Sequence, residues 1–165
     1  MGNTLQLTGC SFREVYQSFL PLIYRIAFTY LKNPSDSEDA AQETFLRLLR
    51  QNKSFQSREH CKAWLIVTAG NVCKDILRRK RCSEIPLDSC AELPAAAPAE
   101  RELINAVLDL PERYRMAVLL FYYEGYSVKE TADLLKQQPE TVKTWLRRAR
   151  AKLKERLGES FDDEK

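Results

Sequence analysis

The stretch that decides the fold is residues 127–157, which read SVKETADLLKQQPETVKTWLRRARAKLKERL. Ser127 followed three residues later by Glu130 forms a capping box, which marks the start of a helix. Lys136-Gln137-Gln138 supplies a polar turn, and Pro139 suits the first position of a second helix. Apolar residues then recur every three or four positions, as on a helix with one buried face: Val142, Leu146, Ala149, Leu153 and Leu157. The pattern predicts a short helix, a turn and a longer helix.

The face of the second helix opposite this apolar stripe is polar and strongly basic. A short helix followed by a turn and a basic helix is typical of the helix-turn-helix, whose second helix enters the DNA major groove. Residues near the start of that helix would reach base edges: Glu140, Thr141, Lys143, Thr144 and Arg147. Arg148, Arg150 and Lys154 would meet phosphates, which position a protein without specifying sequence. The alternative is a solvated basic face on an ordinary helical hairpin; turn length, capping box and cation density together favour DNA.

The rest of the chain also shows helical periodicity, so the sequence predicts an all-α protein. Upstream helices are expected over about residues 12–31, 35–51, 61–81, 100–109 and 111–124. Ser35-Asp36-Ser37-Glu38 is interpreted as a second capping box, and Pro111 as the first residue of its helix. The loop before the third helix carries one aromatic residue, Phe55, which we expect to be exposed.

Charge and composition divide the chain into two domains. Residues 1–81 hold 13 Lys and Arg against 7 Asp and Glu, and residues 113–157 hold 11 against 5. Between them, residues 82–99 contain three prolines, a run of alanines and several acids, which is typical of a flexible linker. We therefore expect domains at 10–81 and 100–157, a linker at 82–99 and an acidic tail at 158–165. The basic blocks imply a polyanionic partner.

Several functions are excluded at this level. No apolar run is long enough to cross a bilayer, and no signal peptide is visible, so a cytoplasmic location is expected. The five cysteines include no C-x-x-C pair and there is one histidine, so no metal site and no cofactor are expected. The N-terminal half offers neither the strands nor the nucleophile of an enzyme such as a recombinase. The sequence predicts a protein that is not an enzyme and has no small-molecule substrate.

Three stretches, in this order and spacing, carry a family resemblance. They are Asp39-Ala40-Ala41-Gln42-Glu43-Thr44-Phe45, then Ala63-Trp64-Leu65 with Asn71 and Asp75, then Thr141-Val142-Lys143-Thr144 with Arg147-Arg148-Ala149-Arg150. Over residues 12–157 the chain resembles the extracytoplasmic-function (ECF) sigma factors, a group of the sigma-70 family of bacterial transcription initiation factors. That family keeps two helical domains, region 2 and region 4, joined by a variable linker. The chain departs from it at Lys136, often Gly, at Glu140, often small, and at Trp145, often Arg.

The resemblance implies roles for particular residues. Asp39, Gln42 and Glu43 would dock on the β′ coiled coil of RNA polymerase core. Phe55 would capture a base flipped from the −10 element, and Asn71, Lys74 and Arg78 would lie along the −10 strand. Region 4 would read the −35 element of promoter DNA through the residues of the basic helix named above, and would contact the β flap. An anti-sigma factor is the expected inhibitor.

Simpler explanations compete with each role. Asp39 and Glu43 also suit the first turns of a helix, where carboxylates favour the helix dipole. Phe55 could cover an edge of the core, and Trp64 is more consistent with core packing than with stacking on a base. For the whole chain, the alternative is a regulator that binds duplex DNA through the helix-turn-helix without polymerase, which leaves the first 81 residues without a role unless they sense a signal or dimerise.

Overall fold

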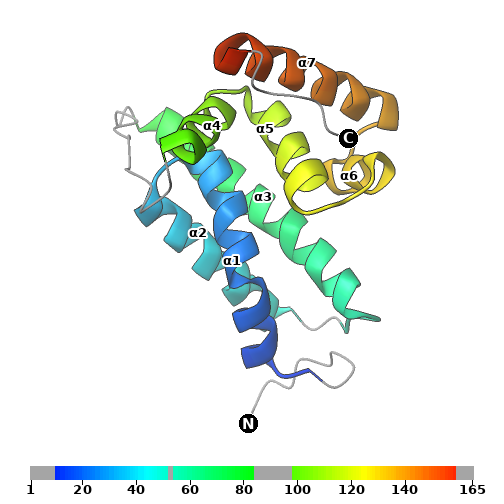
Figure 1. Ribbon diagram of the computed structural model, residues 1–165. Coiled ribbons are helices and arrows are strands. Elements are labelled where there is room, and N and C mark those ends of the chain that lie inside the picture. The colour runs from blue at the N-terminus through cyan, green and yellow to red at the C-terminus, as the bar shows by residue number, and fades with distance from the viewer. Residues whose placement is uncertain (1–9, 52–53, 84–97, 159–165) are drawn as a thin grey trace. The chain divides into compact units, whose positions relative to one another are not determined.

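The computed structural model describes residues 10–51, 54–83 and 98–158, and all the regular elements in these ranges are helices (Figure 1). The all-α prediction is therefore confirmed. The chain divides into two compact units, residues 1–91 and 92–165. Residues 84–97, most of the expected linker, and residues 159–165 of the expected tail lie outside the described residues.

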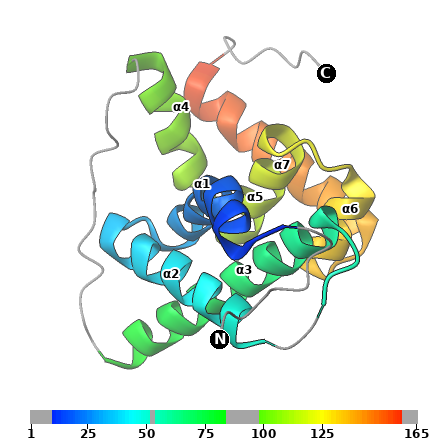
Figure 2. The same cartoon turned by 90° about the horizontal axis from the view of Figure 1, so that it is seen from below.

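Within residues 10–51 and 54–83, the first unit is a bundle of three helices: α1 (Phe12–Leu31), α2 (Pro34–Arg50) and α3 (Arg58–Cys82). Each helix packs against the other two, as both views show (Figures 1 and 2). Its centre holds fully buried aliphatic side chains from all three helices, among them Ile23, Ile26, Leu48 and Leu65. The polar faces of α2 and α3 are consequently left on the outside of the bundle.

The start of α2 differs from the expected one. The capping box predicted at Ser35 is wrong, because α2 begins at Pro34 with Asn33 as its cap. The Asn33 side-chain oxygen accepts the Asp36 backbone N–H at 3.0 Å, and the Ser37 hydroxyl donates to the Asn33 carbonyl at 2.6 Å. Proline is favoured at the first helical position because it lacks the N–H that would otherwise be unsatisfied there. The Asn-Pro pair thus both follows α1 and starts α2.

The segment before α3 also differs. The helix begins at Arg58, where Ser57 is the cap, three residues earlier than expected. Phe55 was expected to be exposed, and this is wrong: its side chain is 3% exposed. Its ring packs edge-on against His60 and Trp64, with centroids 5.4 and 5.8 Å away. An aromatic side chain buries on the order of 150–250 Å² of surface, so folding the ring onto the first turns of α3 is favoured over leaving it in water.

The described part of the second unit contains four α-helices and one π-helical segment. These are α4 (Pro98–Leu108), α5 (Glu112–Val118), η1 (Leu119–Tyr123), α6 (Val128–Leu135) and α7 (Pro139–Leu157). Pro111 is the cap of α5, not its first residue as predicted. Arg115 is 6% exposed and donates to the Leu108 carbonyl at 2.8 Å, which satisfies an end of α4.

The helix-turn-helix forms as predicted. The Ser127 capping box is present: the Ser127 hydroxyl accepts the Glu130 N–H at 3.2 Å, and the Glu130 carboxylate accepts the Ser127 N–H at 2.8 Å. At the other end of α6, Lys136 adopts a left-handed conformation with φ 55°. The chain then enters α7 at Pro139.

The predicted apolar stripe of α7 faces inward. Val142 and Leu146 pack with Ala117 and Ala132, while Ala149 and Leu153 pack with residues of α4 and α5. Trp145 is half-buried and contacts both clusters. The helix is therefore fixed along its length by one face, and its basic face is left outward.

Candidate nucleic-acid interface

The outward face of α7 presents the residues that the sequence assigned to DNA. Glu140, Lys143 and Arg147 are exposed, and Thr141 and Thr144 are half-buried. The first turns of α7 therefore present both acceptors and donors, the two kinds of group that read base edges in the major groove.

Two of the residues nominated for base contact are paired with each other. Lys143 Nζ lies 2.8 Å from Glu140 Oε1, with 58% and 81% of the two side chains exposed. The Thr144 hydroxyl donates to the Glu140 carbonyl at 3.0 Å. Because exposed ion pairs are worth only about 0.2–1 kcal/mol, a base edge can compete for either member of the Glu140–Lys143 pair.

The arginines farther along α7 are held by tyrosines of the preceding helices. Arg150 donates to the Tyr122 hydroxyl at 3.2 Å. A hydrogen bond from Arg148 to the Tyr114 hydroxyl lowers the pKa of Tyr114, and the nearby positive charges of Arg148, Arg113 and Lys152 lower it further. Tyr122 thus accepts a hydrogen bond from one of the two guanidinium groups for which the sequence predicts phosphate contact, and Tyr114 lies close to the other.

In the first unit, the other candidate residues form two faces. Asn71, Lys74 and Arg78 are all exposed and share one side of α3, at helical spacing. Asp39 and Gln42 are exposed and Glu43 is half-buried on α2. Phe55 does not join either face, because its buried ring offers no free surface to a flipped base in this conformation.

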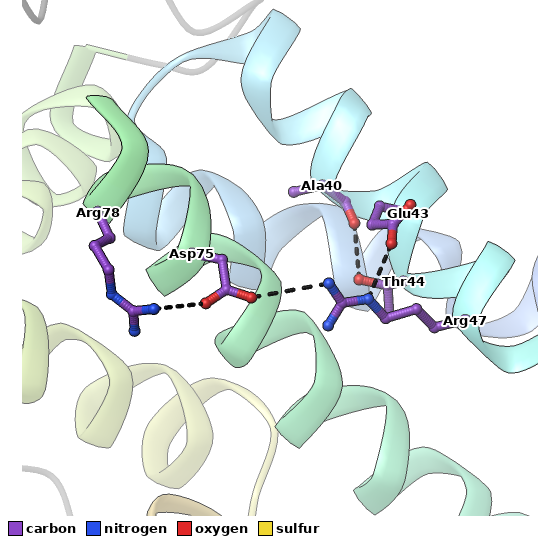
Figure 3. Close-up of polar contacts among 6 residues, drawn as sticks. All are labelled: Ala40, Glu43, Thr44, Arg47, Asp75 and Arg78. Carbon is purple, nitrogen blue, oxygen red and sulfur yellow. Dashed lines mark hydrogen bonds and ion pairs between the residues drawn. The ribbon is translucent and has the colours of Figure 1, made fainter. Parts of the chain in front are cut away.

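A chain of alternating charges links these two faces (Figure 3). Arg47 Nε on α2 lies 3.0 Å from Glu43 Oε1, and the other end of its guanidinium lies 3.8 Å from Asp75 Oδ2 on α3. The second carboxylate oxygen of Asp75 lies 3.4 Å from Arg78. A second cross-helix ion pair, Lys80 with Asp36, joins α3 to the start of α2.

Sequence reasoning did not assign site roles to Arg47, Asp75, Tyr114 or Tyr122. The i,i+4 spacing of Glu43 and Arg47 and the i,i+3 spacing of Asp75 and Arg78 are visible in the sequence. The contacts between α2 and α3, and between α7 and the two tyrosines, join residues at least 28 positions apart. Leu46 was also missed: it is 42% exposed on α2, within one turn of Gln42 and Glu43.

The fold and these faces define a two-unit helical protein with a helix-turn-helix and a second, separate polar surface. Comparison with known families gives the class. The family model described as Sigma-70 region 2 matches residues 15–82, and that described as Sigma-70, region 4 matches residues 100–153. The chain belongs to the ECF sigma factors of the sigma-70 family, and it therefore acts in transcription initiation.

Relatives and solved structures agree with this membership. The chain is 30% identical over 156 residues to the ECF RNA polymerase sigma factor SigM of Mycobacterium tuberculosis, covering 90% of this chain and 78% of the relative. It is 29% identical over 168 residues to SigW of Bacillus subtilis, covering 89% of each. The sigma factor RpoE from Bartonella quintana, solved with the anti-sigma factor NepR, is 25% identical with a TM-score of 0.77, over 88% of this chain and 96% of RpoE. None of the described helices is long and apolar enough to span a membrane.

Proposed function

We propose that α7 is the part of this sigma factor that reads the −35 element of promoter DNA as a duplex. This proposal rests on the orientation of α7. Its apolar stripe is buried, so the opposite face of the helix points outward and presents exposed polar and cationic side chains. Base contact is assigned to the first turns, at Glu140, Thr141, Lys143, Thr144 and Arg147. Arg148 and Arg150, which lie beside tyrosine hydroxyls, contact the phosphates.

The −10 strand is assigned to the exposed face of α3. Asn71, Lys74 and Arg78 offer an amide and two cations along one side of the helix, in a unit whose first 81 residues carry an excess of positive charge. A basic surface of this kind holds a separated strand by its phosphates, and side-chain amides can hydrogen-bond splayed bases. Phe55 is left out of this assignment because its ring is committed to His60 and Trp64.

The polymerase is assigned to the exposed face of α2. Asp39, Gln42 and Glu43 offer acceptors, and the neighbouring Leu46 adds exposed apolar surface. An apolar anchor beside polar groups is the usual composition of a protein interface. We assign this face to the β′ coiled coil of RNA polymerase core and the second unit, in addition to its DNA role, to the β flap.

The remaining assignments complete the function. The two working parts are region 2 at residues 10–81 and region 4 at 100–157, joined by a linker at 82–99. The chain works in the cytoplasm, and it performs no covalent chemistry itself because polymerase supplies catalysis. An anti-sigma factor is proposed as its inhibitor, as in the solved complex of the similar RpoE.

Transcription with purified components tests the proposal. The full chain is mixed with bacterial core polymerase and a library of promoter fragments, and run-off transcripts are sequenced. Specific transcripts that depend on the chain are expected. Binding to duplex DNA without binding to core polymerase would instead favour the stand-alone regulator.

A point variant tests the −35 assignment by its binding to the same promoter fragments as duplexes. Arg147→Ala should cost about 1–3 kcal/mol of binding and relax the preference at one position of the −35 element, if Arg147 contacts a base. An equal loss of binding on all sequences would show that it contacts a phosphate instead.

A further inference from the structure

The middle members of the charge chain on the first unit, Arg47 and Asp75, have no assigned role in binding. Each has two partners: Arg47 contacts both Glu43 and Asp75, and Asp75 contacts both Arg47 and Arg78. The end members do not contact each other, and they belong to the two faces assigned above to polymerase and to the −10 strand. This row of four charged side chains is therefore a physical connection between those faces (Figure 3).

The geometry gives this connection little structural value. The side chains of Glu43, Arg47 and Asp75 are between 35% and 37% exposed, and that of Arg78 is 75% exposed. Ion pairs at such exposure contribute little to folding. Thr44, by contrast, is fully buried and satisfies its hydroxyl locally, by donating to the Ala40 carbonyl at 2.7 Å. The four charges consequently add little to the stability of the bundle.

Negative and positive side chains alternate from Glu43 to Arg78, and this order determines how Arg78 responds when a partner binds Glu43. A cation from a partner that takes Glu43 leaves the Arg47 guanidinium with one carboxylate, Asp75. Asp75 is then drawn more strongly to Arg47 and holds Arg78 less, since the two arginines compete for one carboxylate. Arg78, already the most exposed of the four, becomes available to an anion.

We propose that Arg47 and Asp75 are positioning residues that couple the two faces, so that a cation bound at Glu43 releases Arg78 to a DNA phosphate. The coupling is reciprocal, because a phosphate at Arg78 favours a cation at Glu43 by the same factor. The proposal rests on the function proposed above, which assigns polymerase to the α2 face and the −10 strand to the α3 face.

Binding of an oligo-dT strand to the full chain tests the coupling. Such a strand offers phosphates without promoter sequence, so the measurement does not depend on −10 recognition, which the transcription assay tests separately. Glu43→Gln imitates an occupied Glu43. The variant should bind the strand more tightly at low ionic strength, as measured by fluorescence anisotropy. The gain should exceed that of the control variant described below by about two- to five-fold, which is the range that one exposed ion pair supplies.

A control variant distinguishes an effect that passes through the four ion-paired residues from the general effect of removing one negative charge. Glu38→Gln makes the same chemical change on an exposed residue of the same helix, outside the chain of four. The gain in affinity for the strand that Glu43→Gln shows beyond Glu38→Gln should disappear when Arg78→Gln or Asp75→Asn is also present. Circular dichroism melting of each variant checks that the bundle is intact.

Three results would overturn the proposal. The first is an equal effect of Glu43→Gln and Glu38→Gln. The second is an excess that persists with Arg78→Gln, because the gain would then come from another cation. The third is no binding of the strand by the wild-type chain even at low salt, because Arg78 would then hold no phosphate in either state.

Discussion

Lys136, in the turn of the helix-turn-helix, is the site of our most quantitative prediction. Its φ of 55° places a residue with a Cβ atom in the left-handed region. The following Gln137 N–H reaches the Ala132 carbonyl at 2.9 Å, and the Lys136 N–H reaches the Asp133 carbonyl at 3.2 Å. These two bonds form a Schellman end to α6, which requires the left-handed conformation at Lys136. Glycine is the residue that adopts it without steric cost.

The size of the effect follows from two opposing terms. A side chain in the left-handed conformation costs roughly 1–2 kcal/mol. Glycine removes that cost, but it loses about 0.5–1 kcal/mol because its unfolded chain is more free. Lys136→Gly should therefore increase the free energy of unfolding of the second unit by about 0.75 kcal/mol, the centre of the range of roughly 0–1.5 kcal/mol that the two terms span. The Lys136 side chain is exposed, so little packing is lost with it.

Urea denaturation followed by tryptophan fluorescence measures this change. The chain has two tryptophans, Trp64 in the first unit and Trp145 in the second. In a Trp64→Phe background the signal reports the second unit through Trp145, which packs in both of its apolar clusters. Free energies of unfolding are obtained by linear extrapolation.

Lys136→Ala is the matched control. It removes the same charge and the same side-chain atoms beyond Cβ, but it keeps the steric cost of the left-handed conformation. Lys136→Gly should exceed Lys136→Ala in stability by about 0.75 kcal/mol, from the same two terms. Equal stabilities for the two variants would refute the reasoning, because backbone conformation would then not limit the turn.

Three further predictions concern the second unit. Tyr122→Phe removes the hydroxyl that accepts a hydrogen bond from Arg150, so binding to −35 duplex, measured by fluorescence anisotropy, should weaken about two- to five-fold while the urea midpoint stays unchanged. Unchanged binding would mean that the Tyr122 hydroxyl does not help Arg150 to bind the duplex. Leu146→Ala should cost about 2–5 kcal/mol in urea, since Leu146 is 4% exposed in the apolar cluster, and a loss below 1 kcal/mol would contradict that packing. Hydrogen bonds from Ser127 lower the pKa of Glu130 below 4.5, so this carboxylate stabilises α6 above that pH and ceases to do so as the pH falls through the lower pKa of the folded state. The Glu130→Gln variant should therefore show a smaller fall in urea midpoint between about pH 6 and pH 3 than the wild type. An equally steep fall in the variant would contradict the assignment.

Local sequence signals were sufficient for the helix-turn-helix. Its capping box, its proline and its apolar stripe each act within one or two helical turns, so their meaning does not depend on the rest of the chain. The start of α2 shows where this fails. The sequence pattern predicts the cap at Ser35, whereas the structure uses Asn33 because Pro34 fits the first helical position.

Contacts between helices could not be predicted in the same way. Phe55 lies in a polar stretch, and nothing near it in sequence shows that its ring folds back on Trp64. The pairing of Arg47 with Asp75 depends on the rotation of α2 against α3, which the packing of their apolar faces sets. The same holds for Tyr122 and Arg150, which are 28 positions apart. The sequence thus predicts which faces are exposed, and the structure adds which charges on those faces are held.

The two parts of the α7 surface differ in how firmly the fold holds them, and this difference bears on what each part contributes. Arg150 is hydrogen-bonded to a hydroxyl of another helix and Arg148 lies beside Tyr114, so less side-chain freedom is lost when they meet phosphates. Glu140 and Lys143 pair only with each other at the surface, and a base edge must separate them before it binds either. A wrong base leaves that pair broken without a replacement, whereas the phosphates are the same on every sequence. We therefore expect Arg148 and Arg150 to supply affinity, and the Glu140–Lys143 pair to supply discrimination.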